Sequence, residues 1–441
     1  MPPLALERII GLVIRWREVR DRASTTPGRL RLLSVAVTAG AAVLWLAGSG
    51  VLAGSSGALD GIGRGTVPAI VLTQQIHAAL AAADRSAANA FLSGGIEIVE
   101  PRTEYEIDIA AATADLEQAA EQNRAGSAAS LQLQAIGALL AQYTGLVEQA
   151  RANNRQGFPI GVAYLRDASR LMHRPSDGIL ARVDAVSVLN GRDLDREGSA
   201  LTFSLAVAAA FLVLAAGLLG LLGYTQRFLR RHFNRQLNDG LLAASAAVVL
   251  LGAWMGSQAA HTMVSAGTAD QAYARVHDLW LARSLANDAD GNVSLSLAAL
   301  GGGAEFDQAF TSETAQLGGL LTAELRDARF PGEHAAALRT LATFGRFLSA
   351  DAAVRDAVGH GDQQGAVSVA LGTRPGQLAV VFGEFDEALG DTIAVVQGQF
   401  GAAIDAARSP LGLDVGLPCL AAAIALLTLW GLQPRIAEYG G

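Results

Sequence analysis

The chain has almost no cysteine, no lysine and few aromatic residues. A single cysteine, Cys419, among 441 residues excludes disulfide bonds within the chain. All 33 basic residues are arginines. Aromatic side chains make up 6% of the sequence although 51% of it is hydrophobic, so alanine, leucine and valine supply most of the apolar content. With a mean hydropathy of +0.31, this composition is atypical of a large soluble protein.

Charged residues are also absent from four long apolar stretches. A helix needs about 20 apolar residues to cross a bilayer, and each stretch has about that length. About 30 residues precede the first stretch, which is longer than the apolar part of a signal peptide, so it is not expected to be cleaved. We predict four transmembrane helices, at residues 32–54, 200–224, 240–262 and 414–432.

Arginines are unevenly distributed between the segments that flank these helices. Residues 1–31 contain seven Arg and three acidic residues, and the link at residues 225–239 contains four Arg and one Asp. The long segments are acidic instead, with 17 acidic residues and 12 Arg at 54–199, and 18 acidic residues and nine Arg at 264–413. Because positive residues favour the cytoplasmic side, we expect a multi-pass plasma-membrane protein with both termini in the cytoplasm. The expected cytoplasmic parts are residues 1–31, 225–239 and 433–441, and the expected extracytoplasmic segments are residues 55–199 and 263–413.

Neither long segment has the alternating pattern of β-strands. Apolar residues recur at helical spacing, as at Ile136, Leu140, Tyr143 and Val147. Breaks rich in glycine, proline or asparagine fall near residues 94–95, 126–127 and 153–161 in the first segment, and near 300–306, 329–334 and 358–365 in the second. Three breaks divide a segment into four helices. The predicted fold is an all-α membrane protein with four transmembrane helices and two extracytoplasmic antiparallel four-helix bundles, which resemble tandem sensor modules.

The two halves of the chain also resemble each other. His77 and His277 follow an aliphatic residue in the first helix of each segment, and Glu104-Tyr105 corresponds to Glu305-Phe306. The first and third apolar stretches share a small-residue pair, Gly50/Gly54 and Gly252/Gly256, whose spacing permits close helix approach. The pattern indicates a duplicated unit of two spans and one bundle. The two histidines could bind a metal or respond to pH, but positions on the bundle face are the simpler interpretation.

Catalytic motifs are a further absence. The sequence contains no HExxH, GxSxG, GxxxxGK[ST] or paired CxxC pattern, and its cytoplasmic parts are too short for a catalytic domain. Transport pathways usually require ionisable groups within the membrane, and the apolar stretches offer only Gln258 and His261 near one end. We therefore expect no enzymatic activity, no cofactor and no metal site. The net charge of −8 gives no support for a nucleic-acid partner.

Two surfaces are candidates for contact with partners. In "RQGFPIGVAYLRDASRLMHR", an apolar turn at Phe158, Pro159 and Ile160 precedes Arg166 and Arg170, which align on one helix face. This stretch is either a docking lip for a partner or a turn that packs over the end of the bundle. The basic link is either a cytoplasmic output surface or only a topology signal. Its arginines are Arg227, Arg230, Arg231 and Arg235.

At "NRQGFPIGVAYLRDAS" and the final "GLQPRIAEY", the sequence resembles a family of actinobacterial four-span membrane proteins, the GlnX type. Members of that family are associated with a glutamine-type solute-binding lipoprotein and a protein kinase G-type Ser/Thr kinase. The resemblance extends over the whole chain. It implies a signalling role, in which the availability of glutamate and aspartate is relayed from the extracytoplasmic lipoprotein to the cytoplasmic kinase. The residues themselves leave two alternatives: a sensor whose bundles bind a small ligand directly, or an envelope scaffold without signalling. A homo-oligomer is possible in each case.

Overall fold

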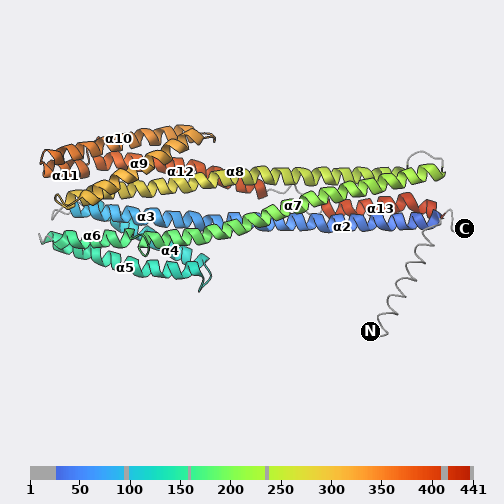
Figure 1. Ribbon diagram of the computed structural model, residues 1–441, viewed down its shortest axis with the longest axis horizontal. Helices are drawn as coiled ribbons and strands as arrows, with labels where there is room; N and C mark the ends of the chain where they lie inside the picture. The colour runs from blue at the N-terminus through green and yellow to red at the C-terminus, as the bar shows by residue number, and fades with distance from the viewer. Residues whose placement is uncertain (1–25, 94–98, 157–159, 234–237, 409–415, 438–441) are drawn as a thin grey trace, which may run out of the picture. The chain divides into compact units, whose positions relative to one another are not determined.

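The computed structural model describes residues 26–93, 99–156, 160–233, 238–408 and 416–437. Within these ranges the chain is helical and contains no strand, which confirms the predicted all-α class. The helices are α2 (Thr26–Gly61), α3 (Val67–Leu92), α4 (Val99–Gln122), α5 (Ala128–Arg155), α6 (Ile160–His173), α7 (Ile179–Phe233), α8 (Asp239–Ala298), α9 (Ala304–Asp327), α10 (Glu333–Gly359), α11 (Gln363–Leu371), α12 (Leu378–Arg408) and α13 (Gly416–Ala437), with a π-helical turn, η1 (Ile62–Thr66), after α2 (Figure 1).

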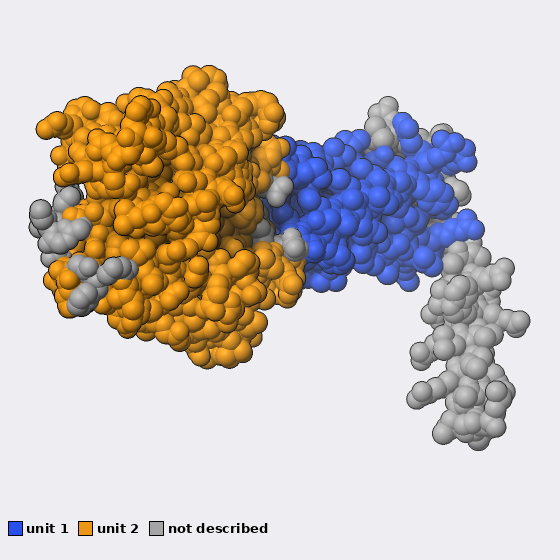
Figure 2. Space-filling model, turned by 60° about the vertical axis from the view of Figure 1, so that its left-hand side comes forward, with its two compact units in different colours: residues 1–60, 197–265, 407–441 blue, residues 61–196, 266–406 orange. Residues whose placement is uncertain are grey.

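The chain divides into two compact units, which Figure 2 shows in different colours. Unit 1 comprises residues 1–60, 197–265 and 407–441, and unit 2 comprises residues 61–196 and 266–406. We refer to residues 61–196 as the first segment and to residues 266–406 as the second segment.

Unit 1 contains the apolar stretches. Four helices are long and apolar enough to cross a membrane, as the sequence predicts. The candidate spans are Gly28–Ala58, Ile179–Arg231, Asp239–Val264 and Gly416–Gln433. Their inward faces share one apolar core that includes Leu44, Phe211 and Leu251. Phe203 and Val213 are more than 70% exposed, a degree of apolar exposure that suits contact with lipid.

Close helix contacts in unit 1 involve glycines, although mostly not those of the predicted pairs. A Cβ atom on Gly48 would lie 2.9 Å from a Leu417 methyl group, and one on Gly240 would lie 2.8 Å from the Cα of Gly431. Gly54 faces Ser204 at 3.5 Å, whereas Gly50 and Gly256 have no neighbour within 4 Å. Spacing alone could not distinguish the glycines that face a neighbouring helix from those that face outward.

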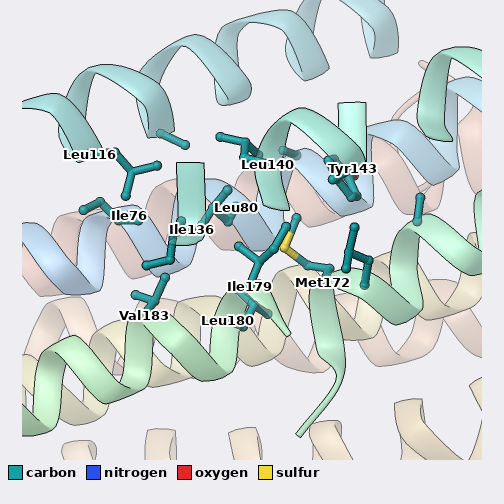
Figure 3. Close-up of a cluster of buried hydrophobic side chains, with 14 of the residues drawn as sticks. Ile76, Leu80, Leu116, Ile136, Leu140, Tyr143, Met172, Ile179, Leu180 and Val183 are labelled. Carbon is teal, nitrogen blue, oxygen red and sulfur yellow. The ribbon is translucent and has the colours of Figure 1, made fainter. Parts of the chain in front are cut away.

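Unit 2 contains two apolar cores, one for each segment. Helices α3 to α7 enclose the first, whose centre includes Leu80, Ile136 and Tyr143 (Figure 3). Helices α8 to α12 enclose the second, around Phe347 and Phe385. The order of the helices around the two cores is the same, in agreement with the duplication inferred from the sequence.

Each segment has one more break than the sequence analysis predicts. The first segment breaks between α6 and α7 at Arg174-Pro175, and the second breaks between α11 and α12 at Arg374-Pro375, 200 positions later. Proline has no N–H to donate and disfavours helical backbone at the preceding residue. Helix α6 ends at His173, directly before this pair, and α11 ends at Leu371, three residues before Arg374. The fourth helix of each bundle is therefore interrupted.

Candidate functional site

The two segments meet where α3 lies beside the C-terminal half of α8. The Gln74 amide nitrogen lies 3.1 Å from His277 Nδ1, and the Ser284 hydroxyl lies 2.9 Å from His77 Nδ1. Further along, Arg85 Nε donates to Asn287 Oδ1 at 3.0 Å, and Ser294 donates to the Asn89 side chain. Because residue numbers rise together on both helices, α3 and α8 run parallel. The helix that occurs twice in the sequence therefore pairs with its own repeat.

We call this polar contact region the seam. Its residues are Gln74, His77, Asp84, Arg85 and Asn89 of α3, His173 of α6, and His277, Ser284, Asn287, Asp288, Asp290 and Ser294 of α8.

Asp84 is the centre of a buried hydrogen-bond cluster in the seam. Its carboxylate accepts hydrogen bonds from the Tyr143 hydroxyl at 3.0 Å, the Ser169 hydroxyl at 2.9 Å and His173 Nε2 at 3.2 Å. The same imidazole nitrogen lies 3.9 Å from Asp288 Oδ1 of the second segment. His173 therefore lies between one carboxylate from each segment.

The surroundings of His173 favour its charged form. Burial disfavours the imidazolium, but the Asp288 carboxylate and the hydrogen bond to Asp84 outweigh it and raise the pKa of His173 to about 9. Burial also raises the pKa of Asp288, an effect that His173 and His77 oppose. At neutral pH, the cluster thus joins the two segments through a protonated histidine between two aspartates.

The surroundings of His77 favour its neutral form, in contrast to those of His173. Its side chain is 16% exposed, and burial lowers its pKa although Asp184 lies 3.4 Å from its Nε2. A neutral imidazole can exchange a hydrogen bond with Ser284 without an uncompensated charge. His77 therefore serves as an uncharged contact in the seam.

Arg85 forms a second node in the seam. Its Nη atoms lie 3.6 Å from a Glu104 oxygen and 3.7 Å from a buried Asp290 oxygen, and its guanidinium stands 4.8 Å above the Phe382 ring. Asn89 Nδ2 also donates to Asp290, at 3.4 Å. Because a buried carboxylate is costly without partners, Arg85 and Asn89 stabilise Asp290 only while the segments are together.

The arginines of the predicted docking lip also reach the second segment. Phe158 and Pro159 lie outside the described residues, and Ile160 is the first residue of α6, with about half of its surface exposed. Arg166 forms an ion pair with Glu305 and lies over the Phe306 ring, and an Arg170 Nη atom is 4.0 Å from the same carboxylate. Docking of a partner at this lip remains a prediction.

The predicted output surface lies in the last turns of α7. Arg227, Arg230 and Arg231 are exposed there, and Arg235 lies outside the described residues. Their spacing of three and four residues places them on one face of the helix end.

Sequence reasoning did not identify Asp84, Arg85, Asp288 or Asp290 as a site. The available signal was polar residues within alanine-rich helices, in "AAADRSAANA" and "LANDADGNVS". A charged residue on an otherwise apolar helix face requires a partner. Arg85 and Asn89 of α3 are partners of Asp290 of α8, whereas Asp84 has its hydrogen-bond partners on α5 and α6. No group of three or more His, Cys, Asp or Glu residues in the described ranges has the arrangement of a metal site.

Comparison with known proteins supports a sensory role for the first segment. Residues 58–199 match the family model of the actinobacterial sensor domain, a range that includes α3 to α6 and the start of α7. No curated protein and no solved structure matches the chain. The match supports an actinobacterial sensor protein in the membrane.

Proposed function

We propose that the protein is a non-catalytic transmembrane signalling component that carries an extracytoplasmic signal to the cytoplasm. The first and second segments are the extracytoplasmic part, and both termini and the basic link are cytoplasmic. The arginine asymmetry supports this orientation. The match of residues 58–199 to a sensor domain supports the role.

The seam is the observation that carries the proposal. Helix α8 extends without interruption from Asp239 to Ala298, so one helix contains a candidate span and the second segment's half of the seam. A shift of α3 against α8 would change the burial of Asp288 and Asp290, whose carboxyl groups have partners across the seam. Such a polar contact has discrete states, and a continuous helix can transmit the change.

The signal and the output follow from the resemblance described above. In this proposal, a solute-binding lipoprotein reports the availability of glutamate or aspartate to the lip at Ile160, Arg166 and Arg170. The exposed arginines at the end of α7 then act on a Ser/Thr kinase, directly or through another protein. The charge of the lip suits an acidic partner surface.

The test uses a strain that lacks this gene and carries full-length variants in its place. Phosphorylation of the kinase's substrates is measured before and after glutamate is added to the medium. We expect the deletion to abolish the response and Asp288→Asn to reduce it severalfold, because the variant removes the carboxylate that lies 3.9 Å from His173 across the seam. Asp278→Asn is the matched control, since it makes the same change at an exposed position of the same helix.

A deletion strain that responds normally would refute the signalling role and favour an envelope scaffold. If Asp288→Asn and Asp278→Asn responded alike at equal membrane levels, signalling would not pass through the seam.

A further inference from the structure

The first segment contains a pocket that lies apart from the Asp84 cluster. The C-terminal end of α3, the beginning of α4, the C-terminal end of α5 and Leu165 of α6 surround a space of about 50 Å³. A buried water needs roughly 10–15 Å³, so this space holds a molecule of a few non-hydrogen atoms. Phe91, Val147 and Leu165 contribute the apolar part of the wall.

A buried hydroxyl in this pocket has no partner. Tyr105 is only 7% exposed, and its hydroxyl makes no hydrogen bond within the described part of the chain. Burial and the Glu148 carboxylate raise the pKa of Tyr105, so the group remains a protonated donor at physiological pH. A buried donor without an acceptor is costly, and a bound oxygen would remove that cost.

The charge of the wall favours an anion. Among the described residues, Arg102, Arg151 and Arg155 line the pocket together with one carboxylate, Glu148, and Arg102 also pairs with Glu106 at 2.6 Å. Glu148 lies 3.1 Å from an Arg151 Nη atom and 3.4 Å from an Arg102 Nη atom, which fixes the two guanidiniums against the pocket. Arg155 is exposed and forms no ion pair with any described residue. Guanidinium groups bind carboxylates through paired hydrogen bonds.

We propose that this pocket binds a small organic anion, a short-chain carboxylate. Its carboxylate accepts hydrogen bonds from the Tyr105 hydroxyl and the Arg151 guanidinium, and its apolar part packs against Phe91 and Leu165. The interpretation of this binding as the sensed event rests on the proposed signalling function. It is motivated by α3, which contributes residues to both the pocket and the seam. Ala87, Ala90 and Phe91 line the pocket, and Asp84, Arg85 and Asn89 lie in the seam on the same turns.

The helix ends around the pocket are linked to one another. The Asn154 amide of α5 donates to the Phe91 carbonyl of α3 at 2.7 Å, and a Cβ atom on Gly161 of α6 would lie 2.9 Å from the Ala150 carbonyl. A ligand that draws α4 and α5 together therefore also displaces the end of α3.

The test measures the binding of three probes to the full chain in lipid nanodiscs by isothermal titration calorimetry. Propionate is the carboxylate, propionamide is its uncharged isostere, and L-alanine adds an ammonium group. We expect propionate to bind at least about tenfold more tightly than propionamide, since charge-assisted hydrogen bonds are lost in the amide. Tighter binding of L-alanine than of propionate would identify an amino acid as the preferred carboxylate, with Glu148 as the partner of its ammonium group.

Two variants and one control separate a specific site from general charge. Tyr105→Phe keeps the ring and removes the donor, and Arg151→Gln keeps most of the length and removes the charge. Each should weaken propionate binding about tenfold or more. Arg124→Gln, in the exposed turn at the other end of α4 and α5, should leave binding unchanged. Propionate that binds both pocket variants as tightly as the native chain, or that does not bind the native chain, would overturn the proposal.

This experiment is independent of the signalling test. If propionate binds but has no effect on kinase signalling, the carboxylate site is supported and its sensory role is refuted. Signalling that depends on Asp288 in a chain that binds no carboxylate would retain the proposed function and refute the pocket.

Discussion

The first and second segments have the same helix order but different centres. The first core is mostly aliphatic, and beside it lie the charged cluster at Asp84 and the pocket at Tyr105. The second core is a cluster of rings, in which Phe347 lies within 6.5 Å, between centroids, of four other phenylalanines. These are Phe310, Phe344, Phe382 and Phe385.

Polar groups are also arranged differently in the two segments. In the second segment the buried hydroxyls of Thr340 and Thr392 bond to each other at 2.9 Å. One of its buried carboxylates, Glu333, lies at the start of α10, where it accepts hydrogen bonds from two backbone N–H groups and pairs with Arg275. These contacts complete a helix end, whereas Asp84 joins three helices of the first segment.

The difference indicates a division of labour between the repeats. A core of interlocked rings resists change, because each ring limits the movement of its neighbours. A core with a polar cluster and a small pocket has fewer such constraints. We infer that the second segment is the rigid partner against which the first segment moves.

The largest expected effect is at the centre of the ring cluster. Phe347 is fully buried, and Phe347→Ala should lower the free energy of unfolding by about 3–5 kcal/mol. Thermal unfolding of the full chain in detergent, followed by circular dichroism, measures this loss. Leu348→Ala, at a partly exposed position of the same helix, should cost far less. Equal losses for the two variants would contradict a rigid second core.

The polar centre of the first segment should be the next most sensitive. Tyr143→Phe removes one of the three donors to the Asp84 carboxylate at little change in volume. A hydrogen bond to a charged group is worth about 1.5–3 kcal/mol, so we expect a loss in that range in the same assay. Thr392→Val removes a neutral hydroxyl contact of the second segment and should cost only about 1 kcal/mol. If Tyr143→Phe and Thr392→Val lowered the free energy of unfolding equally, the hydrogen bond to Asp84 would be no stronger than the neutral one between Thr340 and Thr392.

A smaller effect is expected on the pH dependence of stability, to which His173 of the first segment contributes. The folded-state pKa of His173 is about 9, above the unfolded value of 6.5, so its stabilising contribution is complete below pH 6.5 and is lost as the pH rises through about 9. More than a third of the side chain is exposed, so solvent screening should limit the contribution to about 1 kcal/mol. His173→Gln should remove this part of the pH dependence between pH 6.5 and 9.

The measurement compares unfolding temperatures of the native chain and His173→Gln at pH 6 and pH 9. His360→Gln is the control, since His360 is exposed in the second segment and, among the described residues, bonds only within its own helix end. The same pH dependence in the native chain and His173→Gln would show that His173 does not join the segments by charge.

Much of the fold could be predicted from the sequence, because its signals are local. The spans follow from charge-free runs, and each of the six predicted breaks includes residues between two observed helices, where glycine and proline disfavour helical backbone. The two missed breaks also have a local signal, at Arg174-Pro175 and Arg374-Pro375. A search for equal motifs 200 residues apart would have found them.

The site could not be predicted in the same way, because it depends on contacts between repeats. Asp84, His173 and Asp288 belong to three helices, and no local pattern shows that α3 pairs with α8 instead of with a partner protein. The same limit applies to Arg166 and Arg170. Their alignment on one helix face was visible, but the Glu305 that lies opposite them is more than 130 residues away.

The smallest expected effect is at the exposed edge of the contact between the segments. Arg166 and Glu305 form an ion pair in which both side chains are partly exposed, and such pairs are worth about 0–1 kcal/mol. A double-mutant cycle of Arg166→Ala and Glu305→Ala should therefore give a coupling energy below about 1 kcal/mol, reduced further in 1 M salt. A coupling energy of 2 kcal/mol or more would show that this ion pair is as strong as a buried one, such as that between Arg85 and Asp290. If the coupling energy is small, Arg166 can separate from Glu305 at little cost and pair with an acidic partner. A loss of lipoprotein binding in Arg166→Ala would then be assigned to the docking lip and not to unfolding.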